Sequence, residues 1–316
     1  MIAKICSYLP DGVLTNDQLS ELFPVWSAED IFKKTGIRER RVVAAGECAS
    51  DLAFHAAERA LQGRDRSAID ALIFCTQSPD YRLPASACLI HARLGLSPHC
   101  SALDINQGCS GYIYGLSLAA GLIQSGQASQ VLLLNADAYT SSLAPDDRAT
   151  RAIFGDGAGA TVLSAESLSR LSAFTFGTDG TGAEFLAMKG GGCREPQADP
   201  FIRMNGPEVF NFTLRAVPAV VAEILRKAGL SMEDIDLYVF HQANMFMLEH
   251  LRKKLGIPCH KLFTQLERCG NTTSASIPIA LEAAISHEHI RPTHKVMLVG
   301  FGVGWSWGGC LLEWNP

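Results

Sequence analysis

Apolar residues along the chain gather into short continuous runs rather than alternating with polar ones. This pattern is typical of strands that are buried on both faces of a sheet. Five such runs predict strands, at residues 71–75, 131–134, 158–163, 237–240 and 296–299. Between them, apolar residues recur at helical spacing and predict helices over residues 51–61, 112–125, 217–228 and 247–255. Strands that alternate with helices predict an α/β fold.

Two of the strand motifs recur later in the chain at nearly the same spacing. Residues 68–75 resemble residues 234–241, and residues 131–134 resemble residues 296–299, at offsets that differ by a single residue. Any two buried strands can look alike, but the matching offsets count against that explanation. The repeat predicts two similar halves, residues 1–168 and residues 169–316, each with a sheet packed against helices. The glycine-rich segment 177–200 is expected to lie on the surface.

The composition agrees with a large folded core. Of the 316 residues, 47% are hydrophobic and 19% are charged, and the mean hydropathy is +0.12. The net charge is −5 without a long basic block, which excludes a nucleic-acid-binding protein. No apolar run reaches the roughly 18 residues that a membrane-spanning helix needs. The start of the sequence lacks the pattern of a signal peptide, so we expect a cytoplasmic protein.

The ten cysteines form no C-x-x-C pair, and most are expected to be reduced and buried. Cys109 differs from the rest because it lies between glycines, in Gly108-Cys-Ser-Gly111, directly before a predicted helix. Unpaired N–H groups at a helix N-terminus favour an anion, and such positions lower the pKa of a thiol. Cys109 is therefore a candidate nucleophile. The motif alone is also compatible with a buried structural cysteine.

Two further polar residues stand at the ends of predicted elements. His241 directly follows the strand at 237–240, where α/β proteins place their sites, although a core histidine is an equal alternative. Asn271 lies in a turn of small residues before a predicted helix at 279–285, where a helix cap is the ordinary role. Cysteine, histidine and asparagine together suit thioester chemistry. The cysteine forms an acyl-enzyme, and the other two donate hydrogen bonds to a developing enolate.

Two glycine-rich segments and a group of three histidines are further candidates for a functional site. The segment 300–309 follows a predicted strand and is expected to form a loop that aims N–H groups at an oxyanion. Neither this segment nor residues 155–160 fits the dinucleotide fingerprint, which excludes a nicotinamide site. His287, His289 and His294 lack the spacing of a zinc site and are expected on a solvated surface. No metal is predicted.

In combination, order and spacing, the motifs resemble the β-ketoacyl-acyl-carrier-protein synthase III family of the thiolase superfamily. The resemblance covers essentially the whole chain. It rests on Ser7-Tyr-Leu-Pro10, Thr35-Gly-Ile-Arg-Glu-Arg40, Gly108-Cys-Ser-Gly111, Phe154-Gly-Asp-Gly-Ala-Gly159, His241-Gln-Ala-Asn244 and Gly270-Asn-Thr-Thr-Ser-Ala275. It implies a duplicated five-layer αβαβα fold, with the nucleophilic cysteine in the first half and the histidine and asparagine in the second.

The resemblance also implies a reaction. An acyl-CoA primer acylates Cys109, and decarboxylative Claisen condensation with a malonyl-carrier-protein thioester then gives a 3-oxoacyl thioester. His241 and Asn271 would stabilise the enolate, and the backbone N–H groups of Cys109 and Val303 would form the oxyanion hole. The resemblance implies CoA and carrier-protein thioesters as the substrates, with no cofactor. It also implies that the chain forms a homodimer.

Several substrate-facing positions follow from the same resemblance. Phe301 corresponds to a phenylalanine beside the catalytic residues, Gly206 and Asn244 to positions in the pantetheine tunnel, and Arg148 to an arginine at its CoA-binding mouth. The chain departs from the family where a tryptophan stacks on CoA adenine: Asp30 stands there, and Trp26 is the candidate replacement. Lys34 replaces an arginine at the same mouth.

Further departures affect the partners. In the carrier-protein patch, Phe246 and Asn211 replace basic residues, which leaves Arg252, Lys253 and Lys254 as the docking candidates. Leu83 replaces a phenylalanine that reaches the partner subunit's acyl pocket. These departures leave open the primer, its branching, its carrier, and whether the pathway is primary fatty-acid synthesis or a specialised one.

Three other functions stay open at the level of sequence. A synthase III-like acyltransferase would move the Cys109 acyl group to a hydroxyl or amine, and would have less need of Asn271. A type III polyketide synthase would share the three residues, but such chains are usually longer. A non-catalytic partner subunit normally lacks the triad, which this chain retains.

Overall fold

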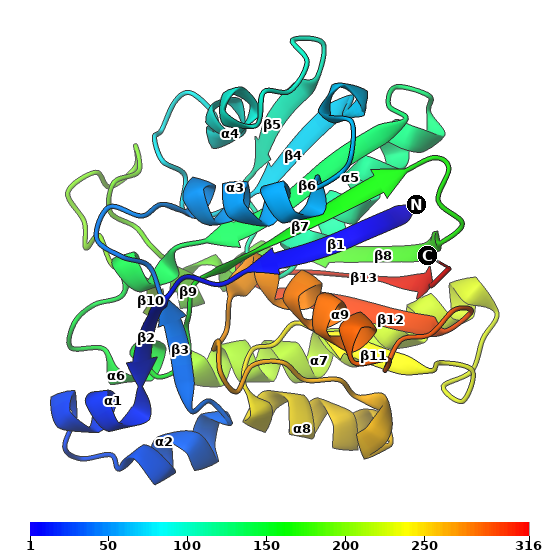
Figure 1. Cartoon of the computed structure of the whole chain (residues 1–316). Helices are drawn as coiled ribbons and strands as arrows, with labels where there is room; N and C mark the ends of the chain where they lie inside the picture. The colour runs from blue at the N-terminus through cyan, green and yellow to red at the C-terminus, as the bar shows by residue number, and fades with distance from the viewer. Residues whose placement is uncertain (316) are drawn as a thin grey trace.

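The computed structural model describes residues 1–315 and contains two large mixed sheets (Figure 1). The first has the order β1-β7-β6-β4-β5, and its strands are β1 (Ile2–Tyr8), β4 (Ala71–Cys75), β5 (Ser101–Ile105), β6 (Gln130–Asp137) and β7 (Gly157–Ser164). The second has the order β11-β12-β13-β8, and its strands are β8 (Arg170–Thr178), β11 (Leu237–Phe240), β12 (Lys295–Gly302) and β13 (Ser306–Glu313).

The two sheets repeat one pattern of strand pairing. In the first, β4 is parallel to β6, while β7 runs antiparallel to both β6 and β1. In the second, β11 is parallel to β12, while β13 runs antiparallel to both β12 and β8. The strands of the first sheet all lie within residues 2–164, and those of the second within residues 170–313. The sequence repeat therefore corresponds to a real repeat of topology; the boundary at residue 168 stays a prediction.

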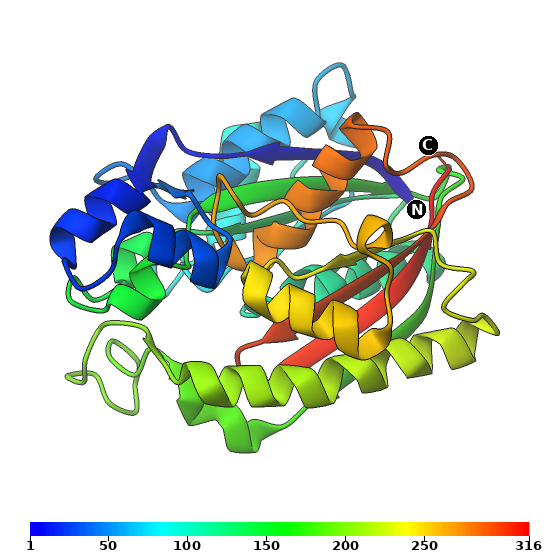
Figure 2. The ribbon, with the colours of Figure 1, turned by 90° about the horizontal axis from the view of Figure 1, so that it is seen from below.

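Helices form three layers around the sheets, as Figures 1 and 2 show. The helices α3 (Ala49–Ala60) and α4 (Ser86–Leu94) cover the outer face of the first sheet, and α7 (Gly206–Ala228) and α8 (Met245–Leu255) that of the second. Between the sheets lie α5 (Gly111–Gln124) and α9 (Ser276–Ser286). This is the five-layer αβαβα arrangement that the resemblance implies.

The layers explain the hydrophobic pattern. Every residue of β4, β7 and β11 is buried because helices cover both faces of each sheet. The central helix α5 packs against both sheets and is therefore apolar on most of its surface. The outer helix α7 begins at Gly206 rather than at residue 217, because Asn205 caps it and Pro207 occupies its first turn.

One expectation about the glycine-rich segment 300–309 is wrong. It is not a single loop: β12 continues to Gly302, residues 303–305 form the turn, and β13 starts at Ser306. The glycines serve close packing instead, because a Cβ on Gly309 would lie 2.6 Å from the Ile224 side chain of α7. The expected surface location of segment 177–200 holds for residues 191–200, which are almost all exposed.

Smaller elements surround one end of the sheets. They are β2 (Gly12–Thr15), α1 (Asn16–Leu22), α2 (Ala28–Thr35), β3 (Glu39–Val42), α6 (Arg148–Arg151), β9 (Leu186–Ala187) and β10 (Arg203–Met204). Short 3₁₀ turns occupy Arg66–Ala68, Tyr139–Ser142, Gly180–Phe185, Cys259–Lys261 and Thr273–Ala275. Across residues 1–315, no helix combines the length and apolar character needed to cross a membrane.

Candidate active site

Cys109 lies directly before α5, as the sequence predicts, and only 5% of the residue is exposed. The end of β12 passes against it. A Cβ on Gly302 would lie 3.1 Å from the Cys109 Sγ, and a Cβ on Gly300 would lie 2.8 Å from its carbonyl oxygen. These glycines allow a strand of the second sheet to touch Cys109, the candidate nucleophile, which the first half carries.

His241 follows β11 and is 2% exposed. Its Nδ1 lies 2.7 Å from the Oγ of Ser276, the first residue of α9, and its ring meets the Phe301 ring edge-on at 5.4 Å. Burial lowers the pKa of His241 to about 3, so the imidazole is neutral at physiological pH. The serine and the phenylalanine fix the orientation of a neutral ring.

Asn271 is held by both its backbone and its side chain. Its N–H donates to the Ile153 carbonyl (2.9 Å), and its own carbonyl accepts from the Gly155 N–H (3.0 Å). The side-chain Oδ1 accepts from the Thr273 N–H (2.9 Å). Since the oxygen is engaged, the amide NH₂ is the group left to meet a ligand.

The three residues line a single cavity of about 520 Å³, its opening included. Most of its wall is apolar, so the few polar groups act in a poorly hydrated space where hydrogen bonds to charge are strong. The lining residues are Cys109, Ile153, Phe154, Leu186, Met204, Gly206, Val209, His241, Ala243, Asn244, Met247, Asn271, Phe301 and Gly302. The predicted tunnel residues Gly206 and Asn244, and Phe301 beside the catalytic group, therefore share the cavity with the triad.

The environment of Cys109 contradicts one expectation. Instead of the lowered pKa that a helix N-terminus favours, burial and the nearby Asp137 carboxylate raise the pKa of this thiol to about 12. Desolvation disfavours the thiolate more than the helix end favours it. In the unliganded protein, Cys109 is therefore a neutral thiol at physiological pH.

Asp137 is a buried residue of the site that the sequence analysis missed. Its carboxylate accepts from the Gln77 N–H (2.7 Å), from the Ser274 hydroxyl (2.8 Å) and from the Thr273 hydroxyl. Burial raises the pKa of Asp137 to about 6. The residue ties the end of β6 to the turn that holds Asn271. An acidic residue at the end of an apolar run, in Leu134-Asn-Ala-Asp137, is the signal that could have identified it.

Val303 lies in the turn after β12, and its side chain faces Gly108, where an added Cβ would lie 3.3 Å from the Val303 Cγ2. Within residues 1–315, the backbone N–H groups of Cys109 and Val303 donate to no other residue. Unpaired N–H groups are rare in a folded core. These two lie on adjoining turns beside the thiol.

The predicted CoA-mouth residues form a cluster. The Lys34 Nζ and the Arg148 guanidinium each lie 4.7 Å from the centre of the Trp26 ring, so two cations contact one indole. Asp30 is engaged elsewhere: its carboxylate accepts from Ser27 and caps α2. The cluster thus contains Trp26 and not residue 30.

The predicted docking residues are not equivalent. The Arg252 guanidinium is paired with Glu249 at 2.9 Å and donates to the Ile257 carbonyl, so it is not free to meet a partner. Lys253 and Lys254 are exposed.

Other predicted residues lie at the surface. Phe246 is 52% exposed and packs against Phe210 and His250, while Leu83 is 82% exposed. His287 and His289 are exposed as expected, whereas His294 is half-buried and accepts a hydrogen bond from the Arg291 N–H. Within residues 1–315, no group of three possible ligands could hold a metal ion.

Comparison with known proteins places these features in a family. A sequence model of 3-oxoacyl-[acyl-carrier-protein] synthase III matches residues 103–180, and the model of its C-terminal part matches residues 225–314. A beta-ketoacyl-[acyl-carrier-protein] synthase III from Roseiflexus sp. is 39% identical, and the match covers 97% of this chain and 96% of the relative.

Solved structures agree. A 3-oxoacyl-(acyl-carrier-protein) synthase III is 48% identical and superposes with a TM-score of 0.97, covering 99% of both chains. The synthase III from Thermus thermophilus is 39% identical with a TM-score of 0.91, again covering 99% of both chains.

Proposed function

Because the chain belongs to the 3-oxoacyl-[acyl-carrier-protein] synthase III family of the thiolase superfamily, we propose that it condenses an acyl-CoA primer with a malonyl-carrier-protein thioester. The product is a 3-oxoacyl thioester, one two-carbon unit longer than the primer. The observation that carries the proposal is the meeting of Cys109, His241 and Asn271 in one apolar cavity. The substrates are thioesters, and no cofactor takes part.

The first half-reaction transfers the primer to the enzyme. The Cys109 sulfur attacks the thioester carbonyl, a new C–S bond forms, and CoA leaves as its thiol with the proton that Cys109 gives up. The tetrahedral oxyanion sits beside the unpaired N–H groups of Cys109 and Val303. Because the resting thiol is neutral, deprotonation accompanies substrate binding and attack.

The second half-reaction uses His241 and Asn271 as neutral hydrogen-bond donors. With the Ser276 hydroxyl donating to Nδ1, the His241 tautomer carries its hydrogen on Nε2 and donates into the cavity. This hydrogen and the Asn271 amide bind the malonyl thioester oxygen. As carbon dioxide leaves, its bonding electrons form an enolate that the two donors stabilise. The enolate carbon attacks the acyl-Cys109 carbonyl, and the Cys109 thiolate departs.

The tunnel to this cavity would hold the pantetheine arm of either thioester, along Gly206 and Asn244. At its mouth, Trp26 with Lys34 and Arg148 supplies an aromatic face and two positive charges. An adenine ring and its phosphates require those features. Trp26 then replaces the tryptophan that is missing at Asp30.

The active form would be a homodimer. Strand β5 is an edge strand of the first sheet, and its Leu103 is 38% exposed; such an edge pairs readily with a second copy. Leu83, on the loop after β4, would then reach the partner subunit's acyl pocket. The carrier protein would dock at the tunnel mouth through Lys253 and Lys254, without Arg252, whose guanidinium is held by Glu249 and Ile257. The half boundary at residue 168 and the cytoplasmic location stay predictions.

Acyl transfer to a hydroxyl or amine is the second candidate. The fixed geometry of the Asn271 amide favours condensation over acyl transfer. In an acyl transfer without decarboxylation, no enolate forms that this amide could stabilise. A type III polyketide synthase-like reaction would need repeated malonyl additions on one primer.

Intact mass spectrometry and product analysis test the proposal together. Acyl-CoA alone should add one acyl mass to the wild-type enzyme and none to Cys109→Ser. Addition of malonyl-carrier-protein should discharge that mass and yield one 3-oxoacyl thioester with release of carbon dioxide. Discharge by a hydroxyl or amine acceptor without carbon dioxide would establish acyl transfer instead.

A further inference from the structure

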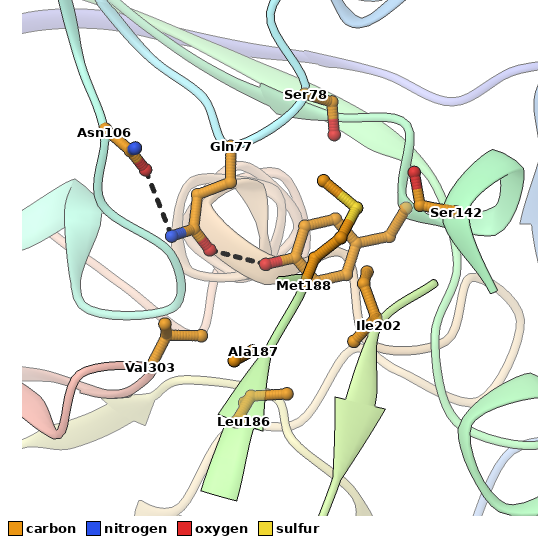
Figure 3. A pocket seen from close by; sticks show the side chains of 10 residues that line it. Gln77, Ser78, Asn106, Ser142, Leu186, Ala187, Met188, Ile202 and Val303 are labelled. Atoms are coloured by element: carbon orange, nitrogen blue, oxygen red, sulfur yellow. Dashed lines mark hydrogen bonds between the residues drawn. The ribbon is translucent and has the colours of Figure 1, made fainter. Parts of the chain in front are cut away.

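A second pocket, of about 560 Å³, lies between the residues that follow β4 and the turn 139–142 (Figure 3). It is distinct from the cavity that holds the triad, although Leu186 lines both. Its lining residues are Gln77, Ser78, Asn106, Tyr139, Ser142, Leu186, Ala187, Met188, Ile202 and Val303.

Gly108, the residue before Cys109, lies against two side chains that line this pocket. A Cβ on Gly108 would lie 2.5 Å from the Gln77 Oε1 and 3.3 Å from the Val303 Cγ2, so both lining side chains cover it. Tyr139 also packs against Phe154, a wall residue of the triad cavity, with ring centres 5.3 Å apart. The pocket therefore adjoins the triad cavity, along Gly108, Phe154 and the shared Leu186.

Three side chains form a hydrogen-bonded row along the pocket. The Tyr139 hydroxyl donates to the Gln77 Oε1, and the Gln77 Nε2 donates to the Asn106 Oδ1 at 3.2 Å (Figure 3). Burial and the Asp137 charge raise the pKa of Tyr139 well above its usual value, so its hydroxyl stays neutral. In this arrangement the Tyr139 hydroxyl uses its single hydrogen on Gln77, and its oxygen stays available as an acceptor.

The row retains unused hydrogen-bonding capacity. The Tyr139 oxygen can accept a further hydrogen bond, and the Gln77 amide keeps a second N–H. Within residues 1–315, the Asn106 amide nitrogen donates to no protein acceptor. A purely alkyl chain lying here would displace water from these groups without replacing its hydrogen bonds.

The other lining residues of the second pocket indicate which further chemical groups a ligand can carry there. Leu186, Ile202 and Met188 offer alkyl contact, whereas Ser78 and Ser142 add hydroxyl groups. None of the lining residues is charged. A carboxylate entering the pocket would lose its hydration without meeting a cation, and this cost is large.

We propose that the acyl group on Cys109 enters this pocket, and that the Tyr139–Gln77–Asn106 row selects a primer whose short acyl chain carries a neutral hydrogen-bonding oxygen, such as a hydroxyl, over a plain alkyl primer of the same length. A ligand hydroxyl donates to the Tyr139 oxygen and accepts from the second Gln77 N–H. The proposal rests on the proposed function, because it concerns the acyl group that Cys109 accepts.

Rates of Cys109 acylation, followed by intact mass spectrometry, test the selection. Four CoA thioesters of matched length serve as probes: butanoyl, 3-hydroxybutanoyl, 4-hydroxybutanoyl and succinyl. The wild-type enzyme should acylate with the better hydroxybutanoyl probe at least about tenfold faster than with butanoyl, and slowest with succinyl. Tyr139→Phe and, separately, Gln77→Met should each reduce the hydroxybutanoyl preference about tenfold.

Tyr114→Phe is the matched control, because its hydroxyl contacts the carbonyls of Gly177 and Trp307, outside the pocket. It should keep the wild-type preference. Equal wild-type rates for butanoyl and both hydroxybutanoyl probes would overturn the proposal, as would a preference that both Tyr139→Phe and Gln77→Met leave unchanged. Failure of every probe to acylate Cys109 would instead overturn the proposed function.

Discussion

Replacing Asn271 with aspartate tests the division of labour between the two half-reactions. In the wild-type protein, the Asn271 Oδ1 accepts from the Thr273 N–H at 2.9 Å, which leaves the amide NH₂ as the donor toward the substrate. In Asn271→Asp, one carboxylate oxygen can keep the contact with Thr273. The other oxygen then occupies the donor position and presents a negative acceptor to the developing enolate.

The magnitude follows from the loss of one preorganised donor. Removing such a donor lowers the rate by about 10²–10³, equivalent to about 2.7–4 kcal/mol. Asn271→Ala should lose about this much in decarboxylation. Asn271→Asp should lose more at pH 8, because it adds repulsion to the lost hydrogen bond. As the pH falls and the buried carboxyl takes up a proton, it becomes a neutral donor and part of the activity should return.

Two separate assays measure the effect. Acylation is followed by the mass of acyl-Cys109, and decarboxylation by carbon dioxide released from a malonyl thioester. Acylation by acyl-CoA should change less than about threefold in both variants, because the oxyanion there meets the N–H groups of Cys109 and Val303. Equal loss in the two half-reactions, or an Asp variant as active as wild type, would refute the role given to Asn271.

Three further predictions concern the nucleophile and the partner. Cys109→Ser should abolish acyl-enzyme formation, since a serine hydroxyl is a far weaker nucleophile at neutral pH; turnover near wild type would exclude Cys109 as the acyl acceptor. Because the pKa of Cys109 is raised to about 12, its alkylation by iodoacetamide should accelerate about tenfold per pH unit from 7 to 9, and a plateau below pH 8 would contradict the raised pKa. Lys253→Glu with Lys254→Glu should raise the KM for a carrier-linked substrate about three- to tenfold at low salt and hardly affect CoA-linked acylation, and Lys4→Glu with Arg64→Glu, at exposed positions elsewhere, should not. An unchanged KM in the Lys253 and Lys254 variant would mean that these lysines do not dock the carrier.

The central strands could be predicted from sequence because both faces of each sheet are buried. The predicted ranges 71–75 and 237–240 coincide with β4 and β11. The outer strand β8 was not predicted, because its buried and exposed residues follow neither the continuous pattern nor a strict alternation. Strand β13 could not be predicted, because its glycines mimic a turn signal while they serve close packing against α7 and β8.

The triad could be predicted because each member stands at the end of an element, next to glycine or other small residues. The groups that orient the triad could not. Ser276 lies 35 residues after His241, and Asp137 lies 136 residues before Thr273. Serine and threonine are common in turns and caps, so their types carry little information until the fold brings them to a partner. The raised pKa of Cys109 could not be predicted either, because the burial of this thiol depends on β12, which is distant in sequence.

The position of Asp137 shows how the two halves build one site. The residue ends β6 of the first half, and its carboxylate accepts from Thr273 and Ser274 in the turn of the second half. That turn fixes the Asn271 amide through the Thr273 N–H. Together with burial, the same negative charge raises the pKa of Cys109, so the group that fixes the turn of Asn271 also disfavours a free thiolate. In the proposed reaction Cys109 carries negative charge only in passing, when it attacks the primer thioester and when it departs from the acyl group in the second half-reaction. The N-terminus of α5 and the N–H groups of Cys109 and Val303 favour negative charge, which is present on the sulfur and the oxyanion only during turnover. Their contribution therefore accelerates the reaction rather than stabilising the resting enzyme.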